Sequence, residues 1–146
     1  MSILQFLTPL PVSVDAPPHA LALCGWKVPA GFPSPAADHS QKRIDLNDHL
    51  VRNPEATFLF RVKGDSMTGA GIYEGDTLVV DRSLEAKHND IVLAVLHSEF
   101  TVKRLYRRGE VIKLLAENPL YPPRVIKPDE ELIVWGVVTY NLHKLN

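Results

Sequence analysis

The sequence has little of what marks a secreted, membrane-spanning or nucleic-acid-coating protein. Its single cysteine, Cys24, excludes an intrachain disulfide, and nothing indicates an oxidising compartment. No apolar run approaches the ~18 residues that a membrane-spanning helix needs. The 16 basic and 17 acidic residues give a net charge of −1, which provides no electrostatic basis for strong nucleic-acid binding. The first residues also lack the basic stretch of a signal peptide, so we expect a cytoplasmic location.

Prolines are concentrated at the start of the chain, where seven of the twelve lie within the first 35 residues. Proline fixes φ and removes a hydrogen-bond donor, so this stretch is unsuited to a helix or to the interior of a sheet. We therefore expect residues 1–45 to form an extended N-terminal arm, followed by a short helix at 45–51. The rest of the chain, 46–146, is long enough for one domain with a single core.

From residue 57 onward, short runs rich in apolar and β-branched residues alternate with turn residues. Runs at such regular intervals predict a mostly β domain of short, mainly antiparallel strands, arranged as a sandwich or a barrel. No internal repeat is present. The expected strands are 57–62, 77–81, 90–96, 100–106, 111–116 and 132–139.

Ser66 is the first candidate for chemistry, because it directly follows Gly64 and Asp65 after the first expected strand. A glycine at this place lets the backbone bend sharply, which exposes the serine Oγ and leaves nearby N–H groups for an oxyanion. The same residues are also typical of an ordinary turn between strands. Thr68 stands where the nucleophile elbow of α/β-hydrolases has a glycine, so that fold is not indicated.

Lys103 is the second candidate, and it lies inside the expected strand 100–106. Strand alternation puts Thr101, Lys103 and Leu105 on one face. If that face is buried, desolvation lowers the pKa of the lysine, and the Thr101 hydroxyl lies beside it. A neutral lysine amine can take the proton of a serine hydroxyl. The alternative is an exposed lysine that protects a sheet edge from aggregation.

The remaining reactive groups predict no further site. The six histidines show no spacing typical of metal ligands, so neither a metal nor another cofactor is expected. Cys24 lies in the proline-rich arm, where nothing supplies a base or a rigid cleft, and we interpret it as a passive thiol.

Taken together, the motifs resemble those of the UmuD-type SOS mutagenesis proteins, which are relatives of the LexA repressor in peptidase family S24. Residues 30–38 (AGFPSPAAD) resemble their self-cleavage segment, and residues 64–67 (GDSM) resemble their nucleophile motif. Residues 99–105 (EFTVKRL) resemble the lysine strand, and 135–138 (WGVV) the closing strand of the LexA/UmuD C-terminal-type β domain. The resemblance covers roughly residues 30 to 140.

The spacing of the motifs agrees with the family as well. Ser66 stands 36 residues after Ala30, and Lys103 stands 37 residues after Ser66. The resemblance implies that Ser66 is the nucleophile of a self-cleaving serine endopeptidase and that Lys103 is its general base. It implies supporting or oxyanion roles for Asp65, Met67 and Thr101.

Two bonds that precede a glycine compete for the cut. Cys24–Gly25 is the bond type that some relatives cleave, whereas only Ala30–Gly31 is followed by Phe-Pro-Ser-Pro. Ala30–Gly31 also stands at the family's distance from Ser66. We therefore place the cut at Ala30–Gly31.

The resemblance implies a homodimer that cuts its own arm when a RecA–single-stranded-DNA filament stimulates it. The shortened form then acts as an accessory subunit of a UmuC-like, Y-family translesion DNA polymerase. A LexA-like repressor fragment is an alternative, but the ~30 proline-broken residues before the cut cannot form a helix-turn-helix. A type I signal peptidase also uses a serine and a lysine, but it needs a membrane anchor, and the sequence offers no apolar run for one. The alternative from another class is a catalytically silent β-domain that only mediates interactions.

Overall fold

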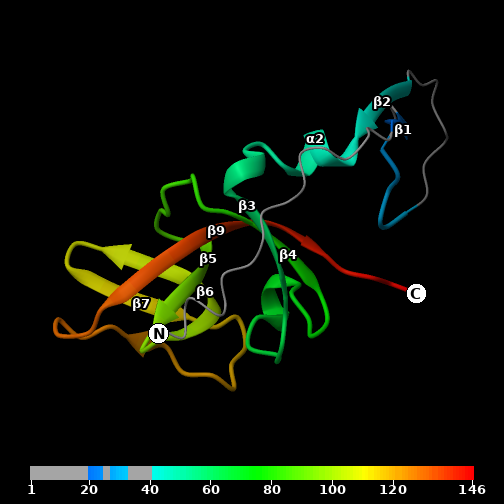
Figure 1. Cartoon of the computed structure of the whole chain (residues 1–146). Coiled ribbons are helices and arrows are strands. Elements are labelled where there is room, and N and C mark those ends of the chain that lie inside the picture. The colour runs from blue at the N-terminus through cyan, green and yellow to red at the C-terminus, as the bar shows by residue number, and fades with distance from the viewer. Residues whose placement is uncertain (1–19, 25–26, 33–40) are drawn as a thin grey trace. The chain divides into compact units, whose positions relative to one another are not determined.

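The computed structural model describes residues 20–24, 27–32 and 41–146, which divide into two units between Arg52 and Asn53. The first unit contains strands β1 (Ala20–Cys24) and β2 (Gln41–Asp45) and helix α2 (Leu46–Leu50), and the second contains all the other strands (Figure 1). The expected boundary between an arm and a domain, after residue 45, stays a prediction. No helix of the described residues is long and apolar enough to cross a membrane.

In the first unit, β1 and β2 pair as a two-stranded antiparallel sheet, with Ala20 opposite Asp45 and Cys24 opposite Gln41. The proline content predicts no sheet pairing here, so the hairpin is a departure from the expected arm. It forms because the prolines flank the two strands: neither ALALC nor QKRID contains one. The expected Ala30–Gly31 cut lies in the connection between the strands, where residues 27–32 are exposed.

Helix α2 confirms the short helix that the sequence predicts. Asp45 caps it, because its carboxylate accepts a hydrogen bond from the N–H of Asn47 at 2.8 Å. The helix ends at Leu50, and the backbone of Val51 after it is extended. The proline that follows Asn53 also favours extended backbone in the residue before it.

The second unit is a seven-stranded sheet in the order β3-β4-β9-β5-β6-β7-β8, in which all neighbours pair antiparallel. The mostly β, antiparallel fold is therefore confirmed, and each of the six expected strands is present to within a few residues. The two-residue strand β8 was not expected, because it lies in a proline-rich loop. The bounds are β3 (Thr57–Arg61), β4 (Thr77–Asp81), β5 (Ile91–Leu96), β6 (Glu99–Arg108), β7 (Val111–Leu115), β8 (Arg124–Val125) and β9 (Leu132–Leu142).

Strand β9 joins the two halves of this sheet, because it pairs with β4 along one part and with β5 along another (Figure 1). The register shifts by one residue in each pairing, which leaves Trp135 and Thr139 as bulges. Bulges bend a strand and increase its twist, so one long strand can follow both halves. Gly136 lies between them, where a Cβ would come within 2.6 Å of Val80 Cγ1.

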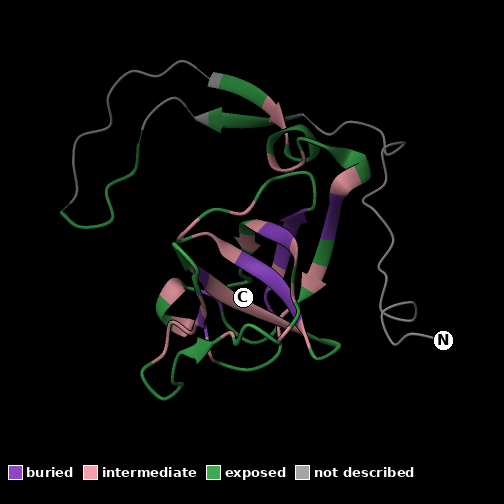
Figure 2. Ribbon diagram, turned by 90° about the vertical axis from the view of Figure 1, so that its left-hand side faces the viewer, coloured by how far each residue is buried: buried purple, intermediate pink, exposed green. Residues whose placement is uncertain are grey.

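Buried residues lie along the strands of the sheet (Figure 2), and the hydrophobic ones form two clusters. Strand β5 divides its residues between two clusters: Leu93 belongs to one, and Val92 and Ala94 belong to the other. This is why its sequence is an unbroken apolar run and shows no alternation. The first cluster is Met67, Ile72, Leu78, Val80 and Leu93, and the second is Val92, Ala94, Leu105 and Leu114.

Candidate active site

Ser66 lies in a turn that follows β3 and is fixed at both ends. Gly64, two residues before the serine, takes a φ of +91°, in the left-handed region that favours glycine. Met67 is only 3% exposed and belongs to the first hydrophobic cluster. A short 3₁₀ helix, Thr68–Ala70, follows it. The serine thus lies between an exposed glycine in the left-handed region and a methionine buried in the core.

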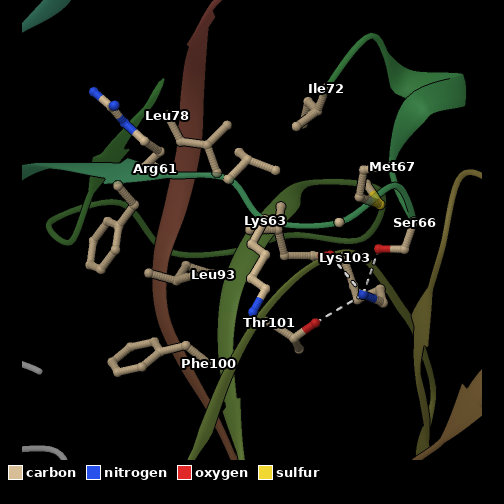
Figure 3. Close-up of a pocket in the computed structure, with 14 residues that line it drawn as sticks. Arg61, Lys63, Ser66, Met67, Ile72, Leu78, Leu93, Phe100, Thr101 and Lys103 are labelled. Carbon is tan, nitrogen blue, oxygen red and sulfur yellow. Dashed lines mark hydrogen bonds between the residues drawn. The ribbon is translucent and has the colours of Figure 1, made fainter. Parts of the chain in front are cut away.

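Lys103 lies in the middle of β6, and its amine points at the serine (Figure 3). The Nζ atom is 2.9 Å from Ser66 Oγ, 2.9 Å from Thr101 Oγ1 and 3.1 Å from the Val102 carbonyl oxygen. Thr101 stands two residues before the lysine on the same strand face, which is where strand alternation puts it. The structure therefore brings together the serine, lysine and threonine that the sequence singled out.

Burial lowers the pKa of Lys103 below its ordinary value of 10.5. No carboxylate of the described residues hydrogen-bonds to the amine, so nothing there offsets the loss of water around the charged form. A neutral amine has two N–H groups and one lone pair. The Val102 carbonyl only accepts and Thr101 is able to accept, which leaves the lone pair for the Ser66 proton. The three contacts therefore suit a lysine that deprotonates the serine.

The pair opens into a cleft of about 220 Å³ (Figure 3). Arg61 and Lys63, at the end of β3, are the basic residues that line it besides Lys103. The rest of the lining is largely apolar, so the cleft suits an extended segment with small or hydrophobic side chains. The apolar lining residues are Phe60, Val62, Met67, Ile72, Leu78, Leu93, Phe100 and Val102.

The other supporting residues differ in where their side chains lie. Met67 lines the floor of the cleft and fixes the turn by its burial. The side chain of Asp65 is exposed, and its carboxylate accepts a hydrogen bond from the Tyr121 hydroxyl. Asp65 supports the turn through its backbone, because its carbonyl oxygen accepts a hydrogen bond from Asn118, while its carboxylate faces Tyr121.

Three residues at the site carry no signal in the sequence: Glu117, Asn118 and Tyr121. They lie in the loop after β7 and contact the turn that carries Ser66. Two of the contacts join main-chain atoms of both segments, and such contacts leave no pattern of residue types. The proline-rich composition of the loop indicates only a turn.

The cut residues lie in the other unit of the chain. Ala30 and Gly31 are exposed, and a Cβ built on Gly31 meets no atom within 4 Å. The backbone of this bond is thus open to an approaching group. Across the described residues, no group of three or more His, Cys, Asp or Glu side chains is arranged to hold a metal ion.

Comparison with known proteins identifies the family. The family described as Peptidase S24-like matches residues 22–139. Protein MucA of Salmonella typhimurium is 45% identical over 125 residues, which is 85% of each chain. Protein SamA of the same species is 48% identical over 118 residues, 81% of each chain. The LexA repressor of Bordetella avium is 39% identical over 141 residues, which is 93% of this chain and 65% of the repressor. The chain therefore belongs to the peptidase S24-like family of self-cleaving serine peptidases, the group of UmuD-type mutagenesis proteins and LexA that its motifs resemble.

Proposed function

We propose that this protein cuts its own chain between Ala30 and Gly31, with Ser66 as the nucleophile and Lys103 as the general base. The observation that carries the proposal is the 2.9 Å contact between Lys103 Nζ and Ser66 Oγ, made by a lysine whose pKa is lowered by burial. A serine hydroxyl is a weak nucleophile until a neighbouring base accepts its proton. Among the described residues, Lys103 Nζ is the basic nitrogen in contact with Ser66 Oγ, which supports this role.

The reaction follows from the contacts of the lysine. Ser66 Oγ attacks the carbonyl carbon of Ala30, and its proton moves to Lys103 Nζ. The negative charge on the former carbonyl oxygen is stabilised by N–H groups of the turn. Lys103 then gives the proton to the nitrogen of Gly31, which leaves as a free amine. The neutral lysine finally takes a proton from water, whose oxygen attacks the ester between Ala30 and Ser66, and Lys103 returns that proton to Ser66 Oγ as the ester bond breaks. Thr101 orients the amine throughout.

A substrate on the same chain explains why the cleft needs no elaborate specificity pocket. Tethering gives the scissile bond a high effective concentration, and a small residue on each side of it lets the backbone enter a narrow cleft. The exposed position of residues 27–32 supports this use of the segment.

We further propose that the cut activates the protein as a homodimer in SOS mutagenesis in the cytoplasm. In this proposal a RecA–single-stranded-DNA filament favours the docked state of the arm. The shortened dimer then joins a UmuC-like, Y-family translesion polymerase as an accessory subunit. Membership in the S24-like family and the identity to proteins MucA and SamA support this role.

Incubation of the purified full chain between pH 7 and pH 10, followed by intact-mass analysis, tests the proposed chemistry. Ser66→Ala and Lys103→Ala are expected to fold and to lose cleavage, because each removes one half of the pair. Lys113→Ala is the matched control, since Lys113 lies on the neighbouring strand over the Tyr106 ring and outside the cleft lining. Cleavage retained by either of the first two variants contradicts the assigned role. A wild-type chain that stays intact at every pH, even with an added RecA filament, favours the silent interaction domain.

A further inference from the structure

The turn that carries Ser66 is held from outside the cleft by the loop after β7. The Asn118 side chain donates a hydrogen bond from Nδ2 to the Asp65 carbonyl oxygen at 2.9 Å. The Glu117 N–H donates to the Ser66 carbonyl oxygen at 2.9 Å, and the Gly69 N–H donates to the Glu117 carbonyl oxygen at 2.7 Å. These three hydrogen bonds fix the backbone of the turn against this loop.

The fit between the two segments is close. A Cβ on Gly69 would lie 2.5 Å from the Glu117 carbonyl oxygen, a distance that real Cβ atoms do not reach. The Glu117 carboxylate also pairs with the Arg104 guanidinium, and Arg104 is the neighbour of Lys103 on β6. The same strand therefore supports the lysine on one face and the loop behind the serine on the other.

These contacts determine where two backbone N–H groups point. In a trans peptide the C=O and the N–H point in opposite directions, and no described peptide bond is cis. Because the Asp65 carbonyl faces Asn118, the N–H of Ser66 faces away from the loop. Because the Ser66 carbonyl faces the Glu117 N–H, the N–H of Met67 also faces away from the loop. Neither N–H has an acceptor among the contacts of the described residues.

We propose that Asn118 is a positioning residue, which aims the Ser66 N–H at the oxyanion of the cleavage reaction by holding the carbonyl of the same peptide. The inference rests on the proposed self-cleavage and deepens it. The amide of Asn118 is itself fixed, because its Oδ1 accepts a hydrogen bond from the Leu120 N–H at 3.0 Å. An amide held at its oxygen by an N–H must present its nitrogen to the carbonyl. Asn118 thus supplies the donor in the one orientation that the turn requires.

Two substitutions separate this role from a general effect on folding. Asn118→Asp keeps the oxygen that accepts from Leu120 and removes the donor to Asp65, whereas Asn118→Ala removes both. Each is expected to lower the limiting alkaline rate of self-cleavage by roughly 100-fold, the cost of a small misplacement of a reacting group. In Asn118→Ala, which adds no charge, the midpoint of the pH profile should stay that of the wild type, because Lys103 keeps its contacts. Lys113→Ala is again the control, since Lys113 packs over the Tyr106 ring and lies outside the cleft lining.

Two further measurements report on the oxyanion site directly. A peptide boronic acid ending in alanine forms a tetrahedral anion on Ser66, and its affinity should fall by about the same factor as the rate. The amide ¹⁵N resonance of Ser66 should shift in both variants, because it senses the hydrogen bond at the preceding carbonyl.

The outcomes are distinct. A wild-type limiting rate in both Asn118 variants overturns the inference and leaves the proposed function standing. The inference is also overturned, and the proposed function again stands, if Asn118→Ala loses rate but shifts the pH midpoint or keeps the wild-type affinity for the boronic acid. If Asn118→Ala unfolds, the limiting rate and the boronate affinity of Asn118→Asp alone test the inference. A wild-type chain that never cuts removes the proposed function, and this inference falls with it.

Discussion

Lys103 shows how much of this site depends on the surroundings of one side chain. Its amine is held by a serine hydroxyl, a threonine hydroxyl and a main-chain oxygen, all of them uncharged. Had an acid stood at one of these places, it would have stabilised the ammonium form and raised the pKa. With uncharged partners and burial, the balance moves toward the neutral amine. These uncharged surroundings therefore favour the neutral amine that the proposed base requires.

The first prediction concerns the pH dependence that follows from this lysine. Only the neutral amine accepts the serine proton, so the cleavage rate should rise about tenfold per pH unit and then level off. The midpoint should lie below 10.5, because burial lowers the pKa of Lys103. Intact-mass analysis of timed samples measures the rate. Lys103→Arg should be inactive across the whole range, since a guanidinium stays protonated. A flat or falling profile would count against a lysine base.

The second prediction concerns the close approach at Gly69. Gly69→Ala puts a methyl group where only 2.5 Å separates it from the Glu117 carbonyl oxygen, so the turn must move. We expect a loss of about 1–3 kcal/mol in the free energy of unfolding, together with slower self-cleavage. Denaturant unfolding and the cleavage assay measure the two effects. Gly109→Ala is the comparison, because a Cβ at Gly109 meets no atom within 4 Å. Its φ of +58° means that this alanine costs some backbone strain, but it does not touch the turn that carries Ser66. Equal cleavage rates in the two variants would show that the contact at Gly69 does not position the serine.

At the scale of the elements, the sequence predicts those strands whose own residues are rich in apolar and β-branched side chains. The six β-branched runs are present as β3, β4, β5, β6, β7 and β9, and the alternation of β6 correctly places Thr101 beside Lys103. The β1–β2 hairpin was missed because the prolines around it dominate the local signal. The loop after β7 was missed for a different reason: its role depends on hydrogen bonds to carbonyls more than fifty residues away in the chain, as in the contact between Asn118 and Asp65.

The third prediction concerns the connection between β1 and β2, where the cut is proposed. The backbone of Cys24 is paired with Gln41 in the sheet, whereas Ala30 and Gly31 lie outside both strands. Cutting Cys24–Gly25 would require the end of β1 to leave its partner, which adds a cost that the other bond does not carry. We therefore expect a large fragment that begins at Gly31, as measured by intact mass.

Variants of the two competing bonds check this assignment. Gly31→Glu should block cleavage, because it adds bulk and a charge beside the reacting carbonyl. Cys24→Ala should leave the rate and the products unchanged, since the thiol has no assigned role. A fragment that begins at Gly25 would transfer the cut to the other bond.

At the scale of the whole molecule, the proposed catalytic residues and both hydrophobic clusters lie in one stretch of the chain. The unit that contains Asn53–Asn146 holds both hydrophobic clusters and also Ser66, Thr101 and Lys103. The proposed cut at Ala30–Gly31 falls outside this stretch. Cleavage therefore removes β1 and leaves every strand of the seven-stranded sheet on the large fragment.

The last prediction follows from this division and compares the chain before and after cleavage. Once the small fragment has been removed by gel filtration, β2 has lost β1, its partner among the described strands. Its backbone amides should then exchange with deuterium much faster, because an unpaired strand opens at little cost. The amides of β4 and β9 should keep their protection, and the melting temperature should stay close to that of the uncut Ser66→Ala chain. Loss of protection in β4 or β9 would mean that the removed segment stabilises the sheet, and the large fragment would then not be an independent folding unit.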